Sequence, residues 1–359
     1  MHERCDRIYE LQAEDTGRFD VAAGDLVARL AGSVGSITAM TCDHRFVPLF
    51  ENWVEGCDRA GIEVRDSTMV FPTDRKAFDR IETLGFVAHF DDESELLGGM
   101  RESVGYSDLA WVDHMYHQNW VIERLLSLDG GADLLFQDVD VVWRRDPRPA
   151  LREQAEQGAD IQAMYDGPNP RFQPIYANSG FVYFRNAEPV RVFWADVYDR
   201  HAMVGYYRSQ QEPLNVMLAV YATRGLEVQV LDEERFANGH LYCGGRTPPA
   251  DPWVVHHSWT GTLADKLDRY VESELWYLGD DVLEEMRAQE LAPADPSPAP
   301  TAPPAAATPA EAALLELLVS TRRERDRLQY ALDAMRRSTS WRGTAPLRRL
   351  KDSVARQGR

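Results

Sequence analysis

Short apolar runs alternate with amphipathic segments along the first 260 residues. "SITAMTC" (36–42) is a β-branched run typical of a buried strand, and "VPLFENWVEGCDRAG" (47–61) repeats apolar residues at helical spacing. The alternation continues, with strands expected at 62–71, 133–143, 161–166, 179–186 and 253–259, and helices at 73–85, 115–128 and 211–225. Strands that alternate with helices predict an α/β fold with a mostly parallel central sheet and helices on both faces.

The pattern changes at residue 291. "LAPADPSPAPTAPPAAATPA" (291–310) is rich in Pro and Ala and predicts an extended linker. Residues 311–337 then repeat at alternating spacings of four and three, with Leu or Met at five of the seven positions and Thr321 and Arg325 at the other two, which predicts an amphipathic helix. Either this helix self-associates as a coiled coil, or it folds back on the body. We therefore divide the chain into a globular domain (1–290), the linker, this C-terminal helix and a basic tail (338–359).

Charge separates the body from the tail. The chain has a net charge of −19, and residues 311–359 hold 12 basic and 6 acidic side chains, which leaves 27 basic and 52 acidic in the first 310. A body this acidic repels a phosphate backbone, so nucleic acid is not an expected partner.

Other features point to a reducing compartment. No apolar run approaches the roughly 18–20 residues that a membrane span needs. The first residues, "MHERCDRIYELQAED", lack the apolar core of a secretory signal. The cysteines lie far apart and predict free thiols rather than disulfides or a zinc site: Cys5, Cys42, Cys57 and Cys243. We therefore expect a cytoplasmic protein.

An acidic pair stands inside one of the expected strands. In "LLFQDVDVVWRRDP" (134–147), Asp138 and Asp140 follow an apolar run, and open α/β sheets gather their ligands where strands end. Side chains at positions i and i+2 of an extended segment point the same way, so both carboxylates can face one cation. Hard oxygen ligands suit Mg²⁺ or Mn²⁺, which also take phosphate oxygens. The alternative is a pair of solvated turn acids or caps of the next helix.

Two classes of enzyme place such a pair at a strand end. In haloacid-dehalogenase-like phosphatases the first acid is the nucleophile, which would be Asp138 here. In glycosyltransferases of the GT-A class the pair holds a metal that grips the diphosphate of a sugar nucleotide. The sequence around the pair decides between them.

Four segments resemble the nucleotide-diphospho-sugar transferase family, in its retaining, glycosyltransferase family 77-like group. They are "DVDVVWRRDP" (138–147), "ANSGFVYFRN" (177–186), "QQEPLNVML" (210–218) and "VVHHSWTGTLADKL" (254–267), in the order of that family. The resemblance implies a Rossmann-like GT-A fold and a metal-dependent retaining glycosyltransferase that uses Mn²⁺ or Mg²⁺. It also implies a nucleotide-sugar donor, with a UDP-sugar favoured, and a glycan, lipid-linked glycan or protein acceptor.

The resemblance assigns a metal site. Asp138, Asp140 and His256 are the expected ligands, and Asp138 is alternatively a partner of the donor's ribose hydroxyls. If the strand is regular, His257 points to its opposite face. Lys266 would pair with the donor diphosphate as a point charge and ease departure of the leaving group.

Asp166, Asn178 and Gln211 form the expected catalytic group. Asp166 would accept hydrogen bonds from hydroxyls of the donor sugar, and Asn178 would lie under the donor sugar and the acceptor. Asn215 lies one helical turn after Gln211, on the same face, and is assigned to donor binding.

The remaining assignments concern donor contacts at strand ends. Ser179 and Gly180 form a turn into a strand, where a glycine permits close approach. Thr41, Cys42 and Asp43 end the first strand, where the nucleobase and ribose are expected to rest.

Two departures from the family pattern bear on mechanism. Gln210 stands where the family usually has Asp, and an amide is a poor nucleophile. Either Glu212 supplies the carboxylate that Gln210 lacks, or retention proceeds by attack on the same face of the sugar from which the leaving group departs. We favour the second route. The second departure is "HQN" (117–119), where the family often has Lys. These departures keep a non-catalytic, scaffold-like transferase domain open as an alternative, beside the phosphatase.

The tail resembles a further element. "STSWRGTAPLRRL" (338–350) is similar to a short segment that closes many bacterial glycan-building transferases. Trp341 flanked by arginines predicts peripheral contact with an acidic membrane surface, here the inner face, or a docked partner. The alternative is a solvated basic helix.

Overall fold

The structure is a computed structural model that describes residues 2–100, 109–128, 131–169, 172, 176–243 and 246–291. Met1–Ala294 forms one compact unit. The expected linker beyond Leu291, the helix at 311–337 and the basic tail at 338–359 lie outside the described residues and remain predictions.

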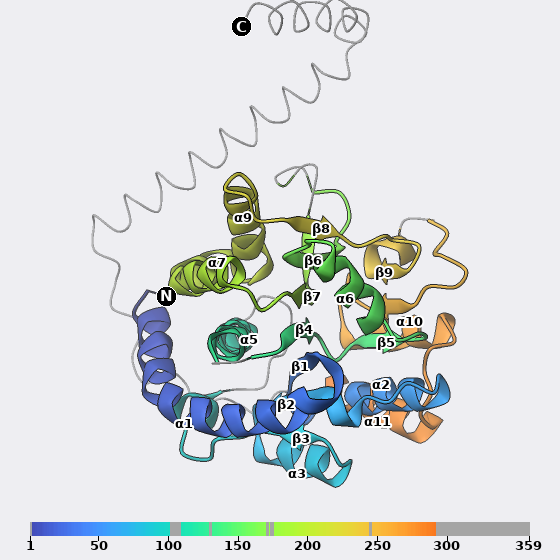
Figure 1. Ribbon diagram of the computed structural model, residues 1–359. Coiled ribbons are helices and arrows are strands. Elements are labelled where there is room, and N and C mark those ends of the chain that lie inside the picture. Colours follow the sequence, from blue (N-terminus) through green and yellow to red (C-terminus); the bar gives the residue numbers. More distant parts are fainter. Residues whose placement is uncertain are drawn as a thin grey trace, which may run out of the picture. The chain divides into compact units, whose positions relative to one another are not determined.

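A seven-stranded sheet forms the centre of this unit, in the order β3-β2-β1-β4-β7-β6-β8 (Figure 1). The strands are β1 (Ser36–Cys42), β2 (Thr68–Pro72), β3 (Val87–Ala88), β4 (Asp133–Gln137), β6 (Ile161–Tyr165), β7 (Ala177–Phe184) and β8 (Val228–Val230). Neighbouring strands are parallel except that β7 runs antiparallel to both β4 and β6. The predicted α/β class with a mostly parallel sheet is confirmed.

Helices cover both faces of the sheet because alternate strand residues are apolar on both sides. One face packs against α1 (His2–Val34), α5 (Leu109–Ser127), α7 (Glu188–Asp199) and α9 (Gln211–Ala222). The other face packs against α2 (Val47–Arg59), α3 (Arg75–Thr83) and α6 (Arg148–Glu156). Ala39 and Met40 illustrate the alternation, since each joins a different apolar cluster.

A second, three-stranded sheet lies on the α2 side, in the order β5-β10-β9. It consists of β5 (Val141–Trp143), β9 (Phe236–Asn238) and β10 (Val254–His256). Val142 and Val255 bury their side chains against Leu267 of α10 (Leu263–Glu272) and Met286 of α11 (Asp280–Leu291). The small sheet thus has an apolar layer of its own on the side away from the central sheet.

The single strand expected at 133–143 is wrong, because the chain changes sheets at the acidic pair. β4 ends at Gln137, the chain turns, and β5 pairs antiparallel with β10. The strand expected at 253–259 likewise ends at His256. The residues on both sides of the break are apolar and buried, so the pattern of apolar residues along the chain did not indicate that one strand ends and another begins.

Other differences are smaller. Ser179 and Gly180, expected in a turn that leads into a strand, already lie within β7. The strand expected at 62–71 begins only at Thr68, after the short 3-10 helix η1 (Arg65–Ser67). The Arg148 guanidinium holds this turn, donating to the Glu63 carbonyl at 2.8 Å and to the Ser67 hydroxyl. The helix α1 was not expected at all, although Ile8, Phe19 and Leu26 among others bury one of its faces. Two short helices, α4 (Glu95–Gly99) and α8 (His201–Tyr207), and the 3-10 helix η2 (Gly239–Tyr242) complete the elements named here.

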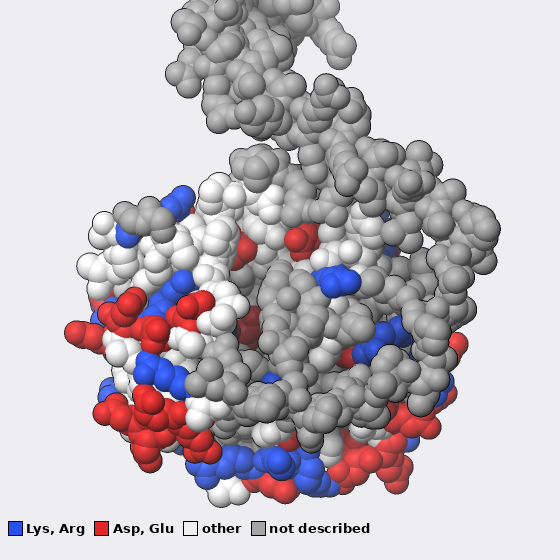
Figure 2. Space-filling view, turned by 180° about the vertical axis from the view of Figure 1, so that it is seen from behind, with Lys and Arg blue, Asp and Glu red and all other residues white. Residues whose placement is uncertain are grey.

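Surface charge is clustered rather than even. On the face in Figure 2, acidic side chains form clusters on either side of the lower edge, with basic side chains between them.

None of the described helices combines the length and the apolar character that crossing a bilayer requires. The absence of a nucleic-acid partner and the cytoplasmic location stay predictions.

Candidate active site

Three acids follow three strands at one edge of the central sheet. Asp43, Asp138 and Asp166 come directly after β1, β4 and β6, whose carboxyl ends meet there because these strands are parallel. The antiparallel β7 starts at the same edge, so its first residues, Ala177–Gly180, lie among the acids. The structure therefore brings most of the expected site residues to one place.

The acidic pair is fixed between the two sheets. The Asp138 backbone N–H donates to the Gly180 carbonyl of β7 at 2.9 Å. The Asp140 carbonyl accepts from the His257 N–H, which directly follows β10, also at 2.9 Å. Each acid is thus anchored to a different sheet, and the turn between them aims both carboxylates at the end of β10.

His256 completes a three-residue cluster at this junction. Its Nε2 lies 3.2 Å from Asp140 Oδ1 and 3.7 Å from Asp138 Oδ2. One ligand atom from each of the three residues lies within 4.8 Å of the others, and His256 is 2% exposed. His257 lies on the other side of the strand, as expected for a regular strand, and its ring stacks on Tyr270 at 3.8 Å between ring centroids.

Lys266 reaches the same cluster from the first turn of α10. Its Nζ pairs with Asp140 Oδ2, and its side chain is partly buried. The expected contact of Lys266 with a diphosphate remains a prediction, but the structure places its charge beside the three expected ligands.

Burial and charged neighbours shift the pKa values of all three residues in this cluster. Burial by itself would raise the pKa of Asp140, but Lys266 and His256 outweigh it and hold that pKa well below its usual range. Burial would likewise lower the pKa of His256, and the carboxylates of Asp140 and Asp138 raise it instead. Burial, followed by the charge of Asp140, raises the pKa of Asp138. The buried carboxylate of Asp140 and the half-buried carboxylate of Asp138 thus lie at one point, where Lys266 and His256 offset part of their charge.

This donor set fits a divalent cation. Two carboxylates and an imidazole are ligands that Mn²⁺ accepts, and Mg²⁺ takes the oxygens. The backbone leaves room for these groups because position 180 is glycine. A Cβ there would lie 2.6 Å from His256 Cε1 and would overlap the Asp138 carboxylate.

A second cluster is centred on Asp166. Its Oδ1 accepts from Asn178 Nδ2 at 2.8 Å and from the Trp259 indole Nε1 at 3.1 Å. Its Oδ2 accepts from Gln211 Nε2 at 2.7 Å. The side-chain oxygen Oε1 of Gln211 in turn accepts from the Ser179 backbone N–H at 3.1 Å. The expected catalytic group of Asp166, Asn178 and Gln211 is therefore one hydrogen-bonded unit.

Asn215 lies behind this unit rather than facing an open space. Its side chain accepts from the Ala177 N–H at 2.7 Å and donates to the Ala177 carbonyl at 2.8 Å. The amide thereby holds the start of β7 against α9. Its expected direct contact with the donor remains a prediction.

The end of β1 contributes residues of two kinds. Thr41 accepts a hydrogen bond from Gln118 at 3.1 Å, whereas Cys42 is buried in the apolar cluster on the opposite face. Asp43 caps the turn that follows, accepting from the Arg45 N–H at 2.9 Å.

Gln118 is a contact that the sequence analysis did not assign. From α5 its Nε2 donates to Asp138 Oδ1 at 3.3 Å, and its Oε1 accepts from Gln210 Nε2 at 2.7 Å. The two departures from the family pattern, at 117–119 and at 210, thus form one pair of amides beside the acidic pair. Trp259 lies in the segment 254–267 that resembles the family, but the sequence analysis assigned it no role of its own.

Relatives of the chain are known from sequence. It is 24% identical over 181 residues to UDP-galactose:fucoside alpha-3-galactosyltransferase of Dictyostelium discoideum, covering 44% of this chain and 27% of that protein. It is 26% identical over 174 residues to beta-arabinofuranosyltransferase RAY1 of Arabidopsis thaliana, covering 41% of this chain and 31% of that protein. The matched part thus spans less than a third of the length of these relatives.

A structural neighbour and a family model complete the comparison. The structure of the galactosyltransferase LgtC with donor and acceptor sugar analogs is 13% identical, with a TM-score of 0.45, covering 70% of this chain and 95% of that one. Residues 63–270, more than half of the chain, match the model of the nucleotide-diphospho-sugar transferases. The chain belongs to the nucleotide-diphospho-sugar transferase family.

Proposed function

We propose that this protein is a metal-dependent, retaining glycosyltransferase that takes its sugar from a nucleotide-diphosphate donor, with a UDP-sugar favoured. The observation that carries the proposal is the convergence of Asp138, Asp140 and His256 from two sheets onto one point, with ligand atoms within 4.8 Å of one another and two of the three residues buried. Family membership supports the same reaction class.

The cluster has a plain chemical use in such a reaction. A divalent ion held by Asp138, Asp140 and His256 would neutralise charge on the departing diphosphate. Lys266 supplies a second positive group at the same point, since its amine already lies against Asp140. Residues 117–119 contain no lysine, although the family often has one in this helix, so we expect neutralisation of the diphosphate to depend strongly on Lys266 and the ion.

The arrangement around Asp166 favours same-face retention. Asp166 accepts three hydrogen bonds from protein donors, which weakens it as a nucleophile, and Gln210 carries no carboxylate. In the favoured route the bond from the anomeric carbon to the diphosphate oxygen breaks while the acceptor oxygen bonds to that carbon on the same face. The acceptor's proton passes to the leaving oxygen. Asn178, Ser179 and Gln211 position the reacting groups.

The same considerations weigh against the two alternatives. A phosphatase would use Asp138 as a nucleophile, but family membership does not favour that chemistry. A scaffold would have no use for two carboxylates, an imidazole and a lysine gathered at one point. Thermal-shift titration with UDP and Mn²⁺ separates the scaffold from the enzyme, because a binding-competent site gains stability with ligand.

The decisive experiment measures hydrolysis or transfer from a panel of UDP-sugars in the presence of Mn²⁺. We expect Asp140→Asn to lower turnover by at least about 100-fold, because it removes one charged ligand. Glu82→Gln, an exposed acid on α3, is the matched control and should leave turnover unchanged. Full turnover in the Asp140→Asn variant would show the assignment to be wrong.

The proposal extends to partners. The acceptor is a glycan, a lipid-linked glycan or a protein, and the reaction is placed in the cytoplasm. Self-association through residues 311–337 and membrane contact through residues 338–359 belong to the same proposal. The family 77-like grouping and the C-terminal element remain predictions from sequence.

A further inference from the structure

Trp259 has an unusual backbone conformation beside the site. Its φ is 60°, in the left-handed region that bulky residues rarely adopt. Its side chain is 50% exposed, whereas Asp166, to which the indole donates a hydrogen bond, is buried. Residues held in such a backbone conformation persist only where the surrounding structure fixes them, and such positions cluster at functional sites.

The protein fixes this residue from both ends. The Trp259 carbonyl accepts from Arg269 Nη2 at 3.0 Å, and the indole Nε1 donates to Asp166 Oδ1 at 3.1 Å. Arg269 also donates to the Ser258 carbonyl. Gly239 lets η2 approach that carbonyl, because any Cβ at this position would overlap it. The half-exposed ring is therefore held in one orientation rather than being a mobile surface side chain.

The ring belongs to the hydrogen-bonded unit around Asp166. Asn178 and Gln211 share that carboxylate with Trp259, and Ser179 and Gly180 lead from Asn178 to Asp138 and His256. The His240 ring packs beside the indole, 6.1 Å between ring centroids. One part of the indole is thus backed by protein, and the exposed part is available to a ligand at this edge of the sheet.

We propose that Trp259 is the platform of a sugar-binding subsite, on which the C–H face of a hexose or pentose ring packs. An indole offers a large rigid apolar surface with little entropy to lose, and a sugar ring presents both apolar C–H groups and hydroxyls. This inference rests on the proposed function, which supplies two sources of such a ring. They are the transferred sugar of the donor and the terminal sugar of the acceptor.

Two variants separate the ring from the backbone conformation. Trp259→Gly deletes the platform and relieves the strain at φ 60°, since glycine adopts this region freely. Trp259→Phe keeps an aromatic surface but loses the bond to Asp166. Tyr206→Ala removes an exposed aromatic side chain from α8 and serves as the control.

The donor arm compares affinities for UDP and for a panel of UDP-sugars (UDP-galactose, UDP-glucose, UDP-xylose and UDP-arabinofuranose) by calorimetry with Mn²⁺. If the platform holds the donor sugar, Trp259→Gly weakens binding of the preferred UDP-sugar about tenfold and leaves UDP unchanged. The acceptor arm titrates methyl glycosides of the same sugars into protein saturated with UDP and Mn²⁺. If the platform holds the acceptor sugar, the tenfold loss appears in this arm instead, and Trp259→Phe retains most of the affinity.

The outcomes are distinguishable. The subsite is refuted if Trp259→Gly matches the wild-type protein in both arms, or if no sugar contributes to binding by the wild-type protein. Failure of UDP to bind the wild-type protein with Mn²⁺ would overturn the proposed function and the subsite together.

Discussion

Gly180 lies where β7 passes closest to the candidate metal ligands. A Cβ at this position would lie 2.6 Å from His256 Cε1 and would overlap the carboxylate of Asp138. The neighbouring Gly180 carbonyl meanwhile accepts from the Asp138 N–H, so the strand cannot move away without releasing the acid. A single missing side chain thus allows the backbone to hold Asp138 and still leave its carboxylate room.

We expect Gly180→Ala to weaken Mn²⁺ binding by about 10- to 100-fold, because Asp138 or His256 must shift. Calorimetric titration with Mn²⁺ measures this without reference to turnover. Gly98→Ala is the control, since a Cβ there meets nothing within 4 Å. Equal Mn²⁺ affinity in the Gly180→Ala variant and the wild-type protein would contradict the assignment of these ligands.

At the scale of elements, α10 directs Lys266 into the site. The helix begins with a capping box, in which the Thr262 side chain accepts from the Asp265 N–H and the Asp265 side chain accepts from the Thr262 N–H. Lys266 follows immediately and points at Asp140. The buried face of the same helix, with Leu267 and Tyr270, packs on the small sheet. The cap and this packing together set the direction of the lysine.

Thr262→Ala removes one half of the capping box, and we expect it to lower the free energy of unfolding by about 1 kcal/mol. Urea denaturation measures the change. Thr83→Ala on α3 is the comparison, because the Thr83 hydroxyl donates to the Asp79 carbonyl within its own helix and caps no N-terminus. Equal losses in the two variants would show that the capping box contributes nothing of its own.

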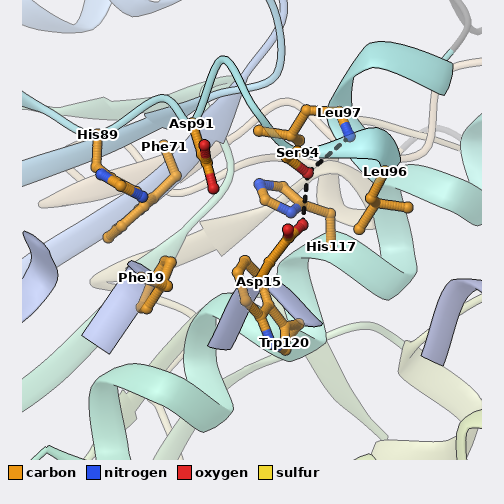
Figure 3. Close-up of a pocket in the computed structure, with 10 residues that line it drawn as sticks. All are labelled: Asp15, Phe19, Phe71, His89, Asp91, Ser94, Leu96, Leu97, His117 and Trp120. Carbon is orange, nitrogen blue, oxygen red and sulfur yellow. Dashed lines mark hydrogen bonds between the residues drawn. The ribbon is translucent and has the colours of Figure 1, made fainter. Parts of the chain in front are cut away.

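At the scale of the molecule, buried histidines link stability to pH. A cavity of about 10 Å³ lies between α1, α4 and α5, with His89, Asp91, Ser94 and Asp15 around His117 (Figure 3). His117 is 2% exposed, and neither ring nitrogen has a hydrogen-bond partner among the described residues. Burial lowers the pKa of His117 to about 3 and also lowers the pKa of His89. Burial raises the pKa of Asp15, so this group by itself favours the folded protein as the pH falls, which opposes the effect of the histidines.

The sign of the effect follows from which state takes up the proton. Between pH 6.5 and 3 the unfolded chain protonates His117 and the folded protein does not, so stability falls as the pH falls. One such histidine removes up to about 1.4 kcal/mol per pH unit once the unfolded chain is fully protonated there, and about 1 kcal/mol over the first unit below pH 6.5, where it is only partly protonated. We expect His117→Phe to reduce the slope of unfolding free energy between pH 6.5 and 5.5 by about 1 kcal/mol per pH unit, measured by urea denaturation. An unchanged slope would contradict the prediction.

Much of the site could be predicted because its positions are tied to strand ends. Asp138 and Asp166 each follow a short apolar run, and parallel strands bring such ends to one edge. His256 was found by the same reasoning, together with the resemblance to a family. Residues 117–119 were noted only as a departure from the family pattern, and the contact of Gln118 with Asp138 could not be found in this way, because the pattern of an amphipathic helix does not show which distant residue a polar side chain meets.

The sequence by itself determined the α/β class, the buried strands and helices, and the acids at their ends, because local periodicity reports which side chains are buried. The tertiary structure decided that the expected strand at 133–143 splits between two sheets and that β7 runs backwards. It also decided that Gln118 donates a hydrogen bond to Asp138 and that Trp259 donates one to Asp166. These features depend on which distant segments pair and pack, and the periodicity of a single segment contains no information about its partner.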